Sequence, residues 1–233
     1  MKSMKNYLDQ ISKTQEIKNL SILELEKLSE EIRSFLLSSI SETGGHIGTN
    51  LGVVELTIAL HYAFNIKNDK IIFDTGHQGY THKILTGRLN NFKTLNQLGG
   101  MSRFIARDES VHDIIDASHA GTAISIASGI ALNYKRNGSK SIAIALVGDG
   151  SMVEGMSFEG LNFGSSTNLP LVIVINDNGM SIPPNVGGIK NLFSGEDSME
   201  KAGAFYSGLG YSYIGVKDGH NINELTNAFN QAK

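Results

Sequence analysis

The sequence predicts an α/β fold, with a mainly parallel sheet flanked by helices. Residues 141–147 and 171–176 form continuous apolar runs without polar alternation, a pattern typical of strands buried on both faces. Residues 154–164, which separate the two runs, have the pattern of a helix. Because strand and helix alternate along the chain, the connections favour a parallel sheet.

An N-terminal helical segment, about residues 1–40, is expected ahead of the sheet. Residues 21–39 carry Leu, Ile and Phe at helical spacing. Ser21 with Glu24 three residues later matches a capping box. A second helix is predicted at about residues 52–65.

The rest of the chain continues the alternation. A short apolar strand is expected at residues 71–73, and residues 122–136 form a predicted helix that stops at Asn-Gly. A further strand is predicted at residues 211–216 and a last helix at residues 221–232. Ligands of parallel sheets bind beside the carboxyl ends of the strands. Three segments follow strands in this way: residues 74–77, 148–151 and 176–180.

The composition excludes several classes of protein. With 20 Lys and Arg against 23 Asp and Glu, the net charge is −3, which argues against sequence-independent nucleic-acid binding. The absence of Cys excludes a disulfide scaffold, a thiolate metal site and a Cys nucleophile. No apolar run is long enough for a signal peptide or a membrane span. We therefore expect a cytoplasmic protein, with all 233 residues in one domain.

The clearest chemical signal lies after the two apolar strands. Gly148-Asp149-Gly150 ends the first, and Asn176-Asp177-Asn178 ends the second, so that Asp149 and Asn178 are 29 positions apart. Neighbouring parallel strands would present this carboxylate and amide side by side. Such oxygen ligands suit Mg²⁺, which takes its remaining ligands from phosphate and water. Gly150 and Ser151 lie where a helix is expected to begin, a favourable place for a phosphate.

This pattern resembles the N-terminal domain of the 1-deoxy-D-xylulose-5-phosphate synthase family, thiamine diphosphate-dependent relatives of transketolase. The resemblance covers nearly the whole chain. It rests on the Gly-Asp-Gly and Asn-rich strand ends and on further segments in family order: SETGGHIGTNLGVVELTIALHYAFN, IIFDTGHQGYTHKILTGR, GGMSRFIARDESVHD, SHAGTAIS, LVGDGSMVEGMSFEGLN and VIVINDNGMSIPPNVGG. It implies the thiamine diphosphate-binding fold and a site for thiamine diphosphate and Mg²⁺.

The resemblance also implies a role for individual residues. Asp149, the Asn178 side chain and the Met180 carbonyl would bind Mg²⁺. His46 would face the substrate, and His77 would handle protons or substrate oxygens near the diphosphate. The cofactor itself would be bound by a larger set: His77, Ser118, His119, Ala120, Gly148, Gly150, Ser151 and Asn178.

Other charged and histidine residues admit two interpretations. His46 follows two glycines and precedes a helix, so its imidazole could be exposed for proton transfer. His61, inside a predicted helix, is expected to pack or to lie on the surface. A basic set in the middle of the chain could meet an anionic substrate or form a solvated surface: Lys83, Arg88, Arg103 and Arg107.

Three departures from the family pattern bear on function. Ser118-His119-Ala120-Gly121-Thr122-Ala123 stands where the family has Gly-His-Ser-Ser-Thr-Ser, so two hydroxyls near the cofactor are lost. The segment at residues 186–205 is shorter than its counterpart. The chain ends at Lys233, and no residue matches the glutamate that the family's pyrimidine-binding domain supplies.

The resemblance therefore implies half of an active site. The expected function is that of an N-terminal subunit or fragment of a thiamine diphosphate-dependent transferase, inactive as this chain alone. The reaction would be decarboxylation of pyruvate or a similar 2-oxo acid and two-carbon transfer to an aldehyde such as a sugar phosphate. A separate chain with the pyrimidine-binding and C-terminal domains is the expected partner, in a homo- or hetero-oligomer. The alternatives are a transketolase-type ketol transferase subunit and a non-catalytic cofactor-binding or assembly subunit.

Overall fold

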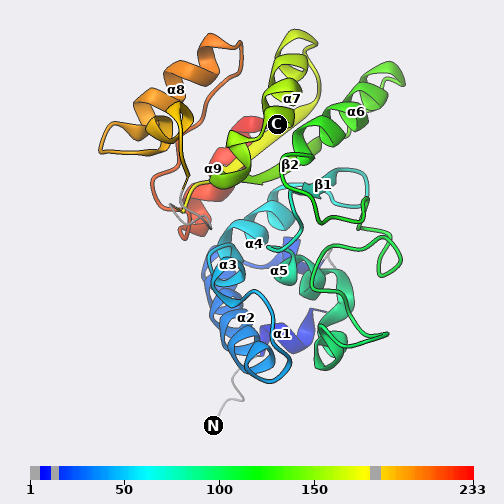
Figure 1. Ribbon diagram of the computed structural model, residues 1–233. Coiled ribbons are helices and arrows are strands. Elements are labelled where there is room, and N and C mark those ends of the chain that lie inside the picture. Colours follow the sequence, from blue (N-terminus) through cyan, green and yellow to red (C-terminus); the bar gives the residue numbers. More distant parts are fainter. Residues whose placement is uncertain (1–5, 12–15, 179–184) are drawn as a thin grey trace.

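A three-stranded parallel sheet organises the chain. The computed structural model in Figure 1 describes residues 6–11, 16–178 and 185–233. The strands are β1 (Lys70–Phe73), β2 (Ala143–Gly148) and β3 (Leu171–Asn176), in the order β1-β2-β3. Both pairings are parallel, so all three strands end at the same edge of the sheet. The predicted parallel α/β architecture is confirmed.

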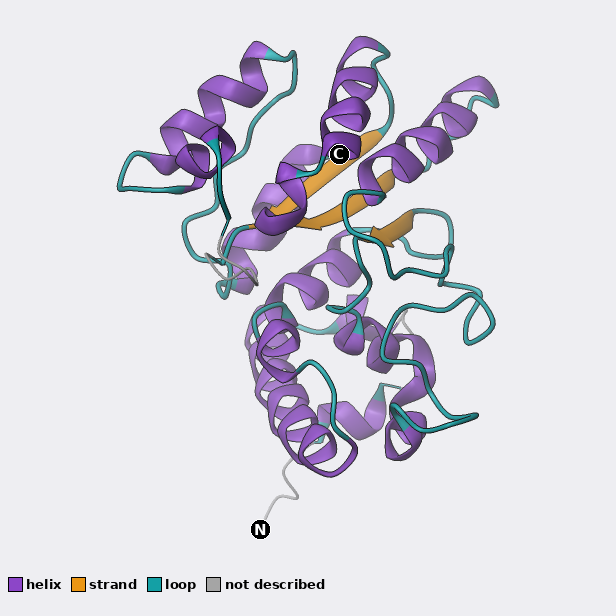
Figure 2. Ribbon diagram, viewed as in Figure 1, coloured by secondary structure: helices purple, strands orange, loops and turns teal. Residues whose placement is uncertain are grey.

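Helices cover both faces of the sheet (Figures 1 and 2). Helices α4 (Val54–Ala63) and α9 (Ile222–Ala232) share a core cluster with one face. The opposite face packs with α6 (Ala123–Arg136), α7 (Gly155–Ser166) and α8 (Ser198–Gly208). Because each helix buries an apolar face against the strands, the sheet lies in a three-layer core.

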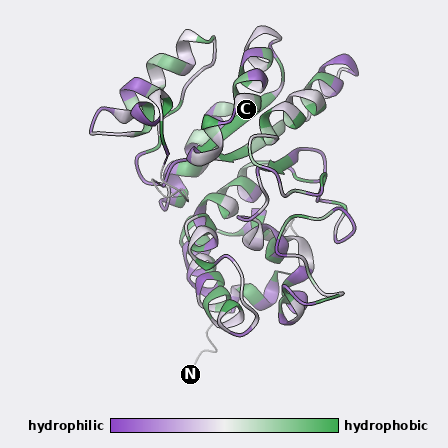
Figure 3. Cartoon of the chain, viewed as in Figure 1, coloured by the Kyte–Doolittle hydropathy of each residue, from purple (hydrophilic) through white to green (hydrophobic). Residues whose placement is uncertain are grey.

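Successive strand residues point to opposite faces. On β1, Ile71 and Phe73 join the core with α4, whereas Ile72 joins the core with α6. On β2, Ile144 and Leu146 point to the α4 side. Apart from Lys70 at the start of β1 and Asn176 at the end of β3, the strands carry no polar side chain, in contrast to the exposed end of α6 (Figure 3). This two-sided burial explains why the strand sequences show no polar alternation.

The N-terminal helices form a second core beside α4. The longest is α2 (Ile22–Thr43), which begins at Ser21 with the predicted capping box, since Ser21 and Glu24 bond each other's backbone reciprocally. Its buried stripe packs on the face of α4 that points away from the sheet. The other elements here are short: α1 (Tyr7–Gln10), α3 (Ile47–Leu51) and α5 (Tyr80–Lys83), with helical turns Glu16–Asn19, Ile84–Arg88 and Leu89–Thr94.

One predicted element is wrong. Residues 211–216 form no strand, and their backbone makes no ladder with β3 among the described residues. Their aromatic side chains instead pack on helices: the Tyr211 hydroxyl donates to the Leu161 carbonyl of α7 at 2.7 Å, and Tyr213 stacks on Tyr206 of α8. In the part of the chain that is described, no helix has both the length and the apolar character to cross a membrane.

A buried ion network attaches the long irregular segment between residues 95 and 122 to the helices. The Arg88 guanidinium donates to both carboxylate oxygens of Asp113, at 2.5 and 3.0 Å, and to Glu109 at 3.2 Å. Lys83, fully buried, donates to Glu109 at 2.5 Å. Because each charge has a partner of opposite sign, the network can remain buried.

A pair of buried histidines extends the network to α4. The ring nitrogens of His61 and His82 lie 2.9 Å apart, and His82 contacts the Asp113 carboxylate at 3.2 Å. Burial opposes the charge of Asp113, but the hydrogen bonds from His82 and Arg88 outweigh it and hold the pKa of Asp113 well below its usual range. Of the two positions expected for His61, packed or on the surface, the structure shows the packed one, since the residue is 1% exposed.

We predict that Asp113→Asn destabilises the fold by about 3–5 kcal/mol, because it leaves the buried charge of Arg88 short of a partner. Urea unfolding at neutral pH measures the change. The depressed pKa of Asp113 means that its contribution is present above pH about 4 and is lost as the pH falls below it.

Asp116→Asn is the matched control, because Asp116 pairs with Arg107 on the surface, where the two side chains are 59% and 65% exposed. Its substitution is expected to leave the unfolding midpoint almost unchanged. Equal losses of unfolding free energy in the two variants would show that the buried network stabilises the fold no more than the surface ion pair does.

Candidate active site

Acidic and amide residues gather at the carboxyl edge of the sheet. Asp74 follows β1, Asp149 follows β2, and Asp177 and Asn178 follow β3. The buried Asp74 carboxylate accepts the backbone N–H groups of Gly121 and Ala123, both at 3.0 Å. An anion at this position stabilises the start of α6 and holds the preceding segment against the strand ends.

The Asp149 carboxylate is buried, with 5% of the residue exposed. Burial and the neighbouring Asp177 carboxylate raise its pKa, while the backbone N–H groups of Asp149, Gly150 and Asn178 oppose the rise. The Asn185 amide also donates to Asp149 Oδ2, at 2.9 Å. A cation beside this carboxylate would stabilise its ionised form.

The structure thus brings Asp149 and Asn178 together, as the spacing predicts. The third candidate metal ligand, Met180, lies outside the described residues. Among the residues that are described, no three His, Cys, Asp or Glu side chains gather closely enough to hold a metal by themselves. A cation here would therefore draw on amide and main-chain oxygens as well as on the carboxylate.

The strand end beside Asp149 is open. A Cβ added to Gly148 would meet nothing within 4 Å, and the Asn176 side-chain nitrogen is buried without a hydrogen-bond partner. Gly150 and the buried Ser151 lie in a short helical turn, Asp149–Val153. The regular helix α7 starts only at Gly155. The helix predicted at residues 154–164 is confirmed as α7, and Gly150 and Ser151 lie in the helical turn just before it.

His46 and His77 form the second part of the site. Their ring centroids lie 5.8 Å apart, and the Phe104 ring lies 5.7 Å from that of His46. Burial and then the charge of Arg103 lower the pKa of His46. Burial and then His46 lower the pKa of His77. Both imidazoles are therefore uncharged at pH 7, and the Nδ1 atom of each is buried without a partner.

Asn50, fully buried, holds these two histidines in place. Its Nδ2 atom donates to the carbonyls of His46 and His77, at 2.6 and 2.8 Å. Its Oδ1 atom accepts the Tyr80 backbone N–H at 2.9 Å. The Tyr80 hydroxyl in turn accepts the His46 N–H at 3.3 Å. One amide side chain therefore connects the His46 segment to the segment of His77 and Tyr80.

The segment with Ser118, His119 and Ala120 lies between the two parts. Ser118 and His119 are exposed, and His119 Nδ1 lies 2.8 Å from the Ala120 carbonyl. A Cβ on Gly76, beside His77, would lie 2.6 Å from that of Ala117, and one on Gly121 would lie 2.7 Å from that of Glu154. These close approaches connect the histidines to the turn after β2, and both glycines have positive φ.

Three residues of this arrangement escaped the sequence interpretation. Asn50 lies in a segment that was singled out for His46. Its own role depends on a fold that brings His77 and Tyr80, 27 and 30 residues later in the chain, into contact with it. For Asp74, the only sequence signal is its position directly after a predicted strand. Asn185 is 36 positions from Asp149 in the chain, and no local sequence pattern indicates the contact between them.

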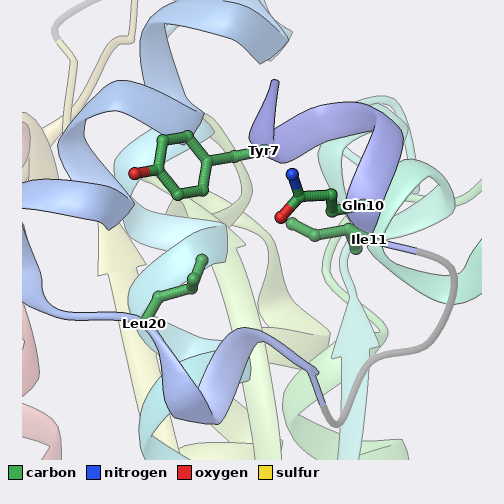
Figure 4. Close-up of a pocket in the computed structure, with 4 residues that line it drawn as sticks. All are labelled: Tyr7, Gln10, Ile11 and Leu20. Atoms are coloured by element: carbon green, nitrogen blue, oxygen red, sulfur yellow. The ribbon is translucent and has the colours of Figure 1, made fainter. Parts of the chain in front are cut away.

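A pocket elsewhere in the structure holds none of the candidate residues. It measures about 270 Å³ and lies among the N-terminal helices, lined by Tyr7, Gln10, Ile11 and Leu20 (Figure 4). It offers one amide and one phenol among apolar groups and contains no charged side chain. The candidate site therefore remains the strand ends, outside this pocket.

We predict that Asn50→Ala destabilises the fold by about 3 kcal/mol, because it leaves two carbonyls and one N–H without partners. It should also shift the imidazole NMR signals of His46 and His77, whose backbone it releases. The matched control is Asn90→Ala, since Asn90 is exposed and its side chain bonds no other described residue. An Asn50 variant as stable as this control would contradict the proposed anchoring.

Comparisons with known proteins agree on one family. A sequence profile described as 1-deoxy-D-xylulose-5-phosphate synthase matches residues 8–202. The synthase of Thermomicrobium roseum is 42% identical, over 97% of this chain and 42% of its own length. That of Listeria monocytogenes is 44% identical, over 93% of this chain and 37% of its own length. The chain thus spans less than half the length of these relatives.

Solved transketolases share the fold. That of Leishmania mexicana superposes with a TM-score of 0.72 at 21% identity, over 89% of this chain and 34% of its own. A transketolase variant of Pichia stipitis gives a TM-score of 0.70 at 22% identity, over 91% and 34%. With the profile match over most of its residues and the synthase relatives above 40% identity, the chain belongs to the 1-deoxy-D-xylulose-5-phosphate synthase family.

Proposed function

We propose that this chain binds thiamine diphosphate through Mg²⁺ and supplies the diphosphate side of a 1-deoxy-D-xylulose-5-phosphate synthase active site. The observation that carries the proposal is the buried Asp149 carboxylate, which lies at an open strand end with Asn178 beside it. Its raised pKa indicates a carboxylate that would gain from a cation. Membership of the synthase family supports the choice of cofactor.

The residues present fit this group. Asp149, the Asn178 side chain and the Met180 carbonyl would supply oxygen ligands, and Mg²⁺ would take the others from diphosphate and water. The backbone of Gly148, Gly150 and Ser151 would hold the diphosphate, with room left by the missing side chain of Gly148. The Asn185 amide donates a hydrogen bond to Asp149 Oδ2, and this bond would break if the metal were bound by that oxygen. The remaining cofactor contacts would come from His77, Asn178 and Ser118, His119 and Ala120.

When bound, thiamine diphosphate supplies the nucleophilic carbon that carries the two-carbon unit from donor to acceptor. The chain contributes two neutral imidazoles beside that chemistry. With lowered pKa values, His46 and His77 can accept a proton or bond a substrate oxygen at neutral pH. Asn50 fixes their backbone, so the two histidine segments are in position before a substrate arrives.

We further propose that a separate chain completes the site. The synthase relatives extend well beyond the region matched here, and in this sequence no residue corresponds to the family's pyrimidine-side glutamate. The partner would carry the pyrimidine-binding and C-terminal domains, and this chain would be inactive without it. The reaction would be decarboxylation of pyruvate or a similar 2-oxo acid, with transfer to an aldehyde such as a sugar phosphate.

Calorimetry with thiamine diphosphate and Mg²⁺ tests the binding site. We expect Asp149→Asn to weaken Mg²⁺-dependent cofactor binding by at least tenfold, because a charged ligand is replaced by a neutral amide. Removing Mg²⁺ with a chelator should have a comparable effect on the unmodified chain. Asp108→Asn is the matched control, since Asp108 is exposed and its side chain bonds no described residue. Unchanged binding by the Asp149 variant would refute the metal assignment.

Activity of the completed enzyme separates the candidate reactions. The chain, mixed with a partner that carries the two remaining domains, is expected to release CO₂ from pyruvate in the presence of an aldehyde acceptor, and neither chain should do so alone. The fold shared with transketolases favours ketol transfer as the second candidate, and turnover with ketose donors only would establish it instead. Cofactor binding without turnover of either donor would point to the non-catalytic assembly role.

A further inference from the structure

Of the four cations that the sequence places in the middle of the chain, three are neutralised by carboxylates. Lys83 and Arg88 are buried in the ion network with Glu109 and Asp113. Arg107 pairs with Asp116 on the surface at 2.9 Å. The fourth, Arg103, forms no ion pair with any carboxylate of the described residues.

Arg103 is nevertheless held in one orientation. Its Nε and Nη2 atoms both donate to the Asn96 side-chain oxygen, at 3.0 and 2.7 Å. An amide oxygen is a neutral acceptor, so the guanidinium keeps its full positive charge. Arginine has five N–H donors, and those not used by Asn96 remain available because Arg103 is exposed.

The position of Asn96 is itself constrained. Its φ of 63° lies in the left-handed region, which Asn tolerates better than most residues, and its N–H donates to the Met101 carbonyl at 2.9 Å. A Cβ added to Gly44, two residues before His46, would lie 3.7 Å from Asn96 Nδ2. The loop that carries Arg103 is therefore fixed directly beside the start of the His46 segment.

The charge of Arg103 reaches the site described above. Phe104, its neighbour in the chain, packs on the His46 ring at 5.7 Å. After burial, Arg103 is the cause that lowers the pKa of His46, and its charge also acts on Tyr80, whose hydroxyl accepts the His46 N–H. An unneutralised, oriented guanidinium thus lies within electrostatic reach of the histidine pair.

Building on the proposed function, we propose that Arg103, positioned by Asn96, binds the anionic group of a substrate whose reacting part faces His46. Both substrate types proposed above carry an oxyanion, the carboxylate of a 2-oxo acid or the phosphate of an aldehyde phosphate. A guanidinium binds either through paired, charge-assisted hydrogen bonds. Lys83, Arg88 and Arg107 are unsuited to this task, since each already serves a carboxylate of the chain.

Titration of the 233-residue chain without cofactor tests this inference independently of the cofactor site. The imidazole NMR signals of His46 are followed while pyruvate, glycerol phosphate or uncharged glycolaldehyde is added. We expect a saturable shift with at least one of the two anions and none with glycolaldehyde. A response to pyruvate alone assigns the donor carboxylate, and a response to glycerol phosphate alone assigns the acceptor phosphate.

The variants separate binding from structure. Arg103→Gln should weaken anion binding by about tenfold, as expected for loss of a charge-assisted contact, and should raise the pKa of His46. Arg103→Lys should retain the effect of the positive charge on the pKa of His46, but only part of the affinity for the anion. Arg107→Gln is the matched control and should change neither the anion affinity nor the pKa of His46. Thiamine diphosphate binding by Arg103→Gln should equal that of the unmodified chain.

Two results would overturn the inference. One is that neither anion shifts the His46 signals, and the other is that Arg103→Gln binds the anion as well as the Arg107→Gln control does. Failure of the proposed function would look different, since it would appear as absent Mg²⁺-dependent cofactor binding whatever the anion titration shows.

Discussion

The hydrogen bonds of Asp74 are the interaction on which the arrangement of the site depends. This buried carboxylate ends β1 and accepts the N–H groups that begin α6. It thereby sets the segment at residues 118–121 between the histidines and the turn after β2. A single helix start is thus stabilised by an anion from another element, and the same contact determines where three separate loops meet. Parallel strands alone bring their ends to one edge, and this contact adds the position of the segment at residues 118–121 beside that edge.

Burial explains why the remaining polar groups behave as they do. Arg88 and Asp113 can stay inside because they neutralise each other, and they anchor the irregular segment in which Arg103 lies. His46 and His77, by contrast, are partly buried without such partners, so they remain neutral. Anchoring groups such as the Arg88–Asp113 pair therefore have their bonding partners within the chain, whereas the Nδ1 atoms of His46 and His77 have none and are available to a ligand.

The sequence predicted the elements whose signal is local. Continuous apolar strands, the capping box at Ser21 and the spacing of Asp149 and Asn178 all depend on neighbours within one or two elements. The segment at residues 211–216 was mispredicted because its composition suits a strand, whereas its tyrosines pack on α7 and α8 instead of pairing with β3. The contacts of Asn50 and Asn185 could not be predicted, since each joins segments far apart in the chain and neither residue type implies its partner. Nor could the sequence tell which of four cations lacks a carboxylate.

The two ends of the site carry opposite charge, and this has a consequence for binding. Asp149 and Asp177 make the strand ends after β2 and β3 negative, which favours a cation there and repels a free anion. Arg103 makes the far side of the histidine pair positive. Cation and substrate anion are therefore directed to different ends, with the neutral imidazoles of His46 and His77 between them. An oxyanion bound at Arg103 would place the rest of a small substrate over these imidazoles, where proton transfer can occur.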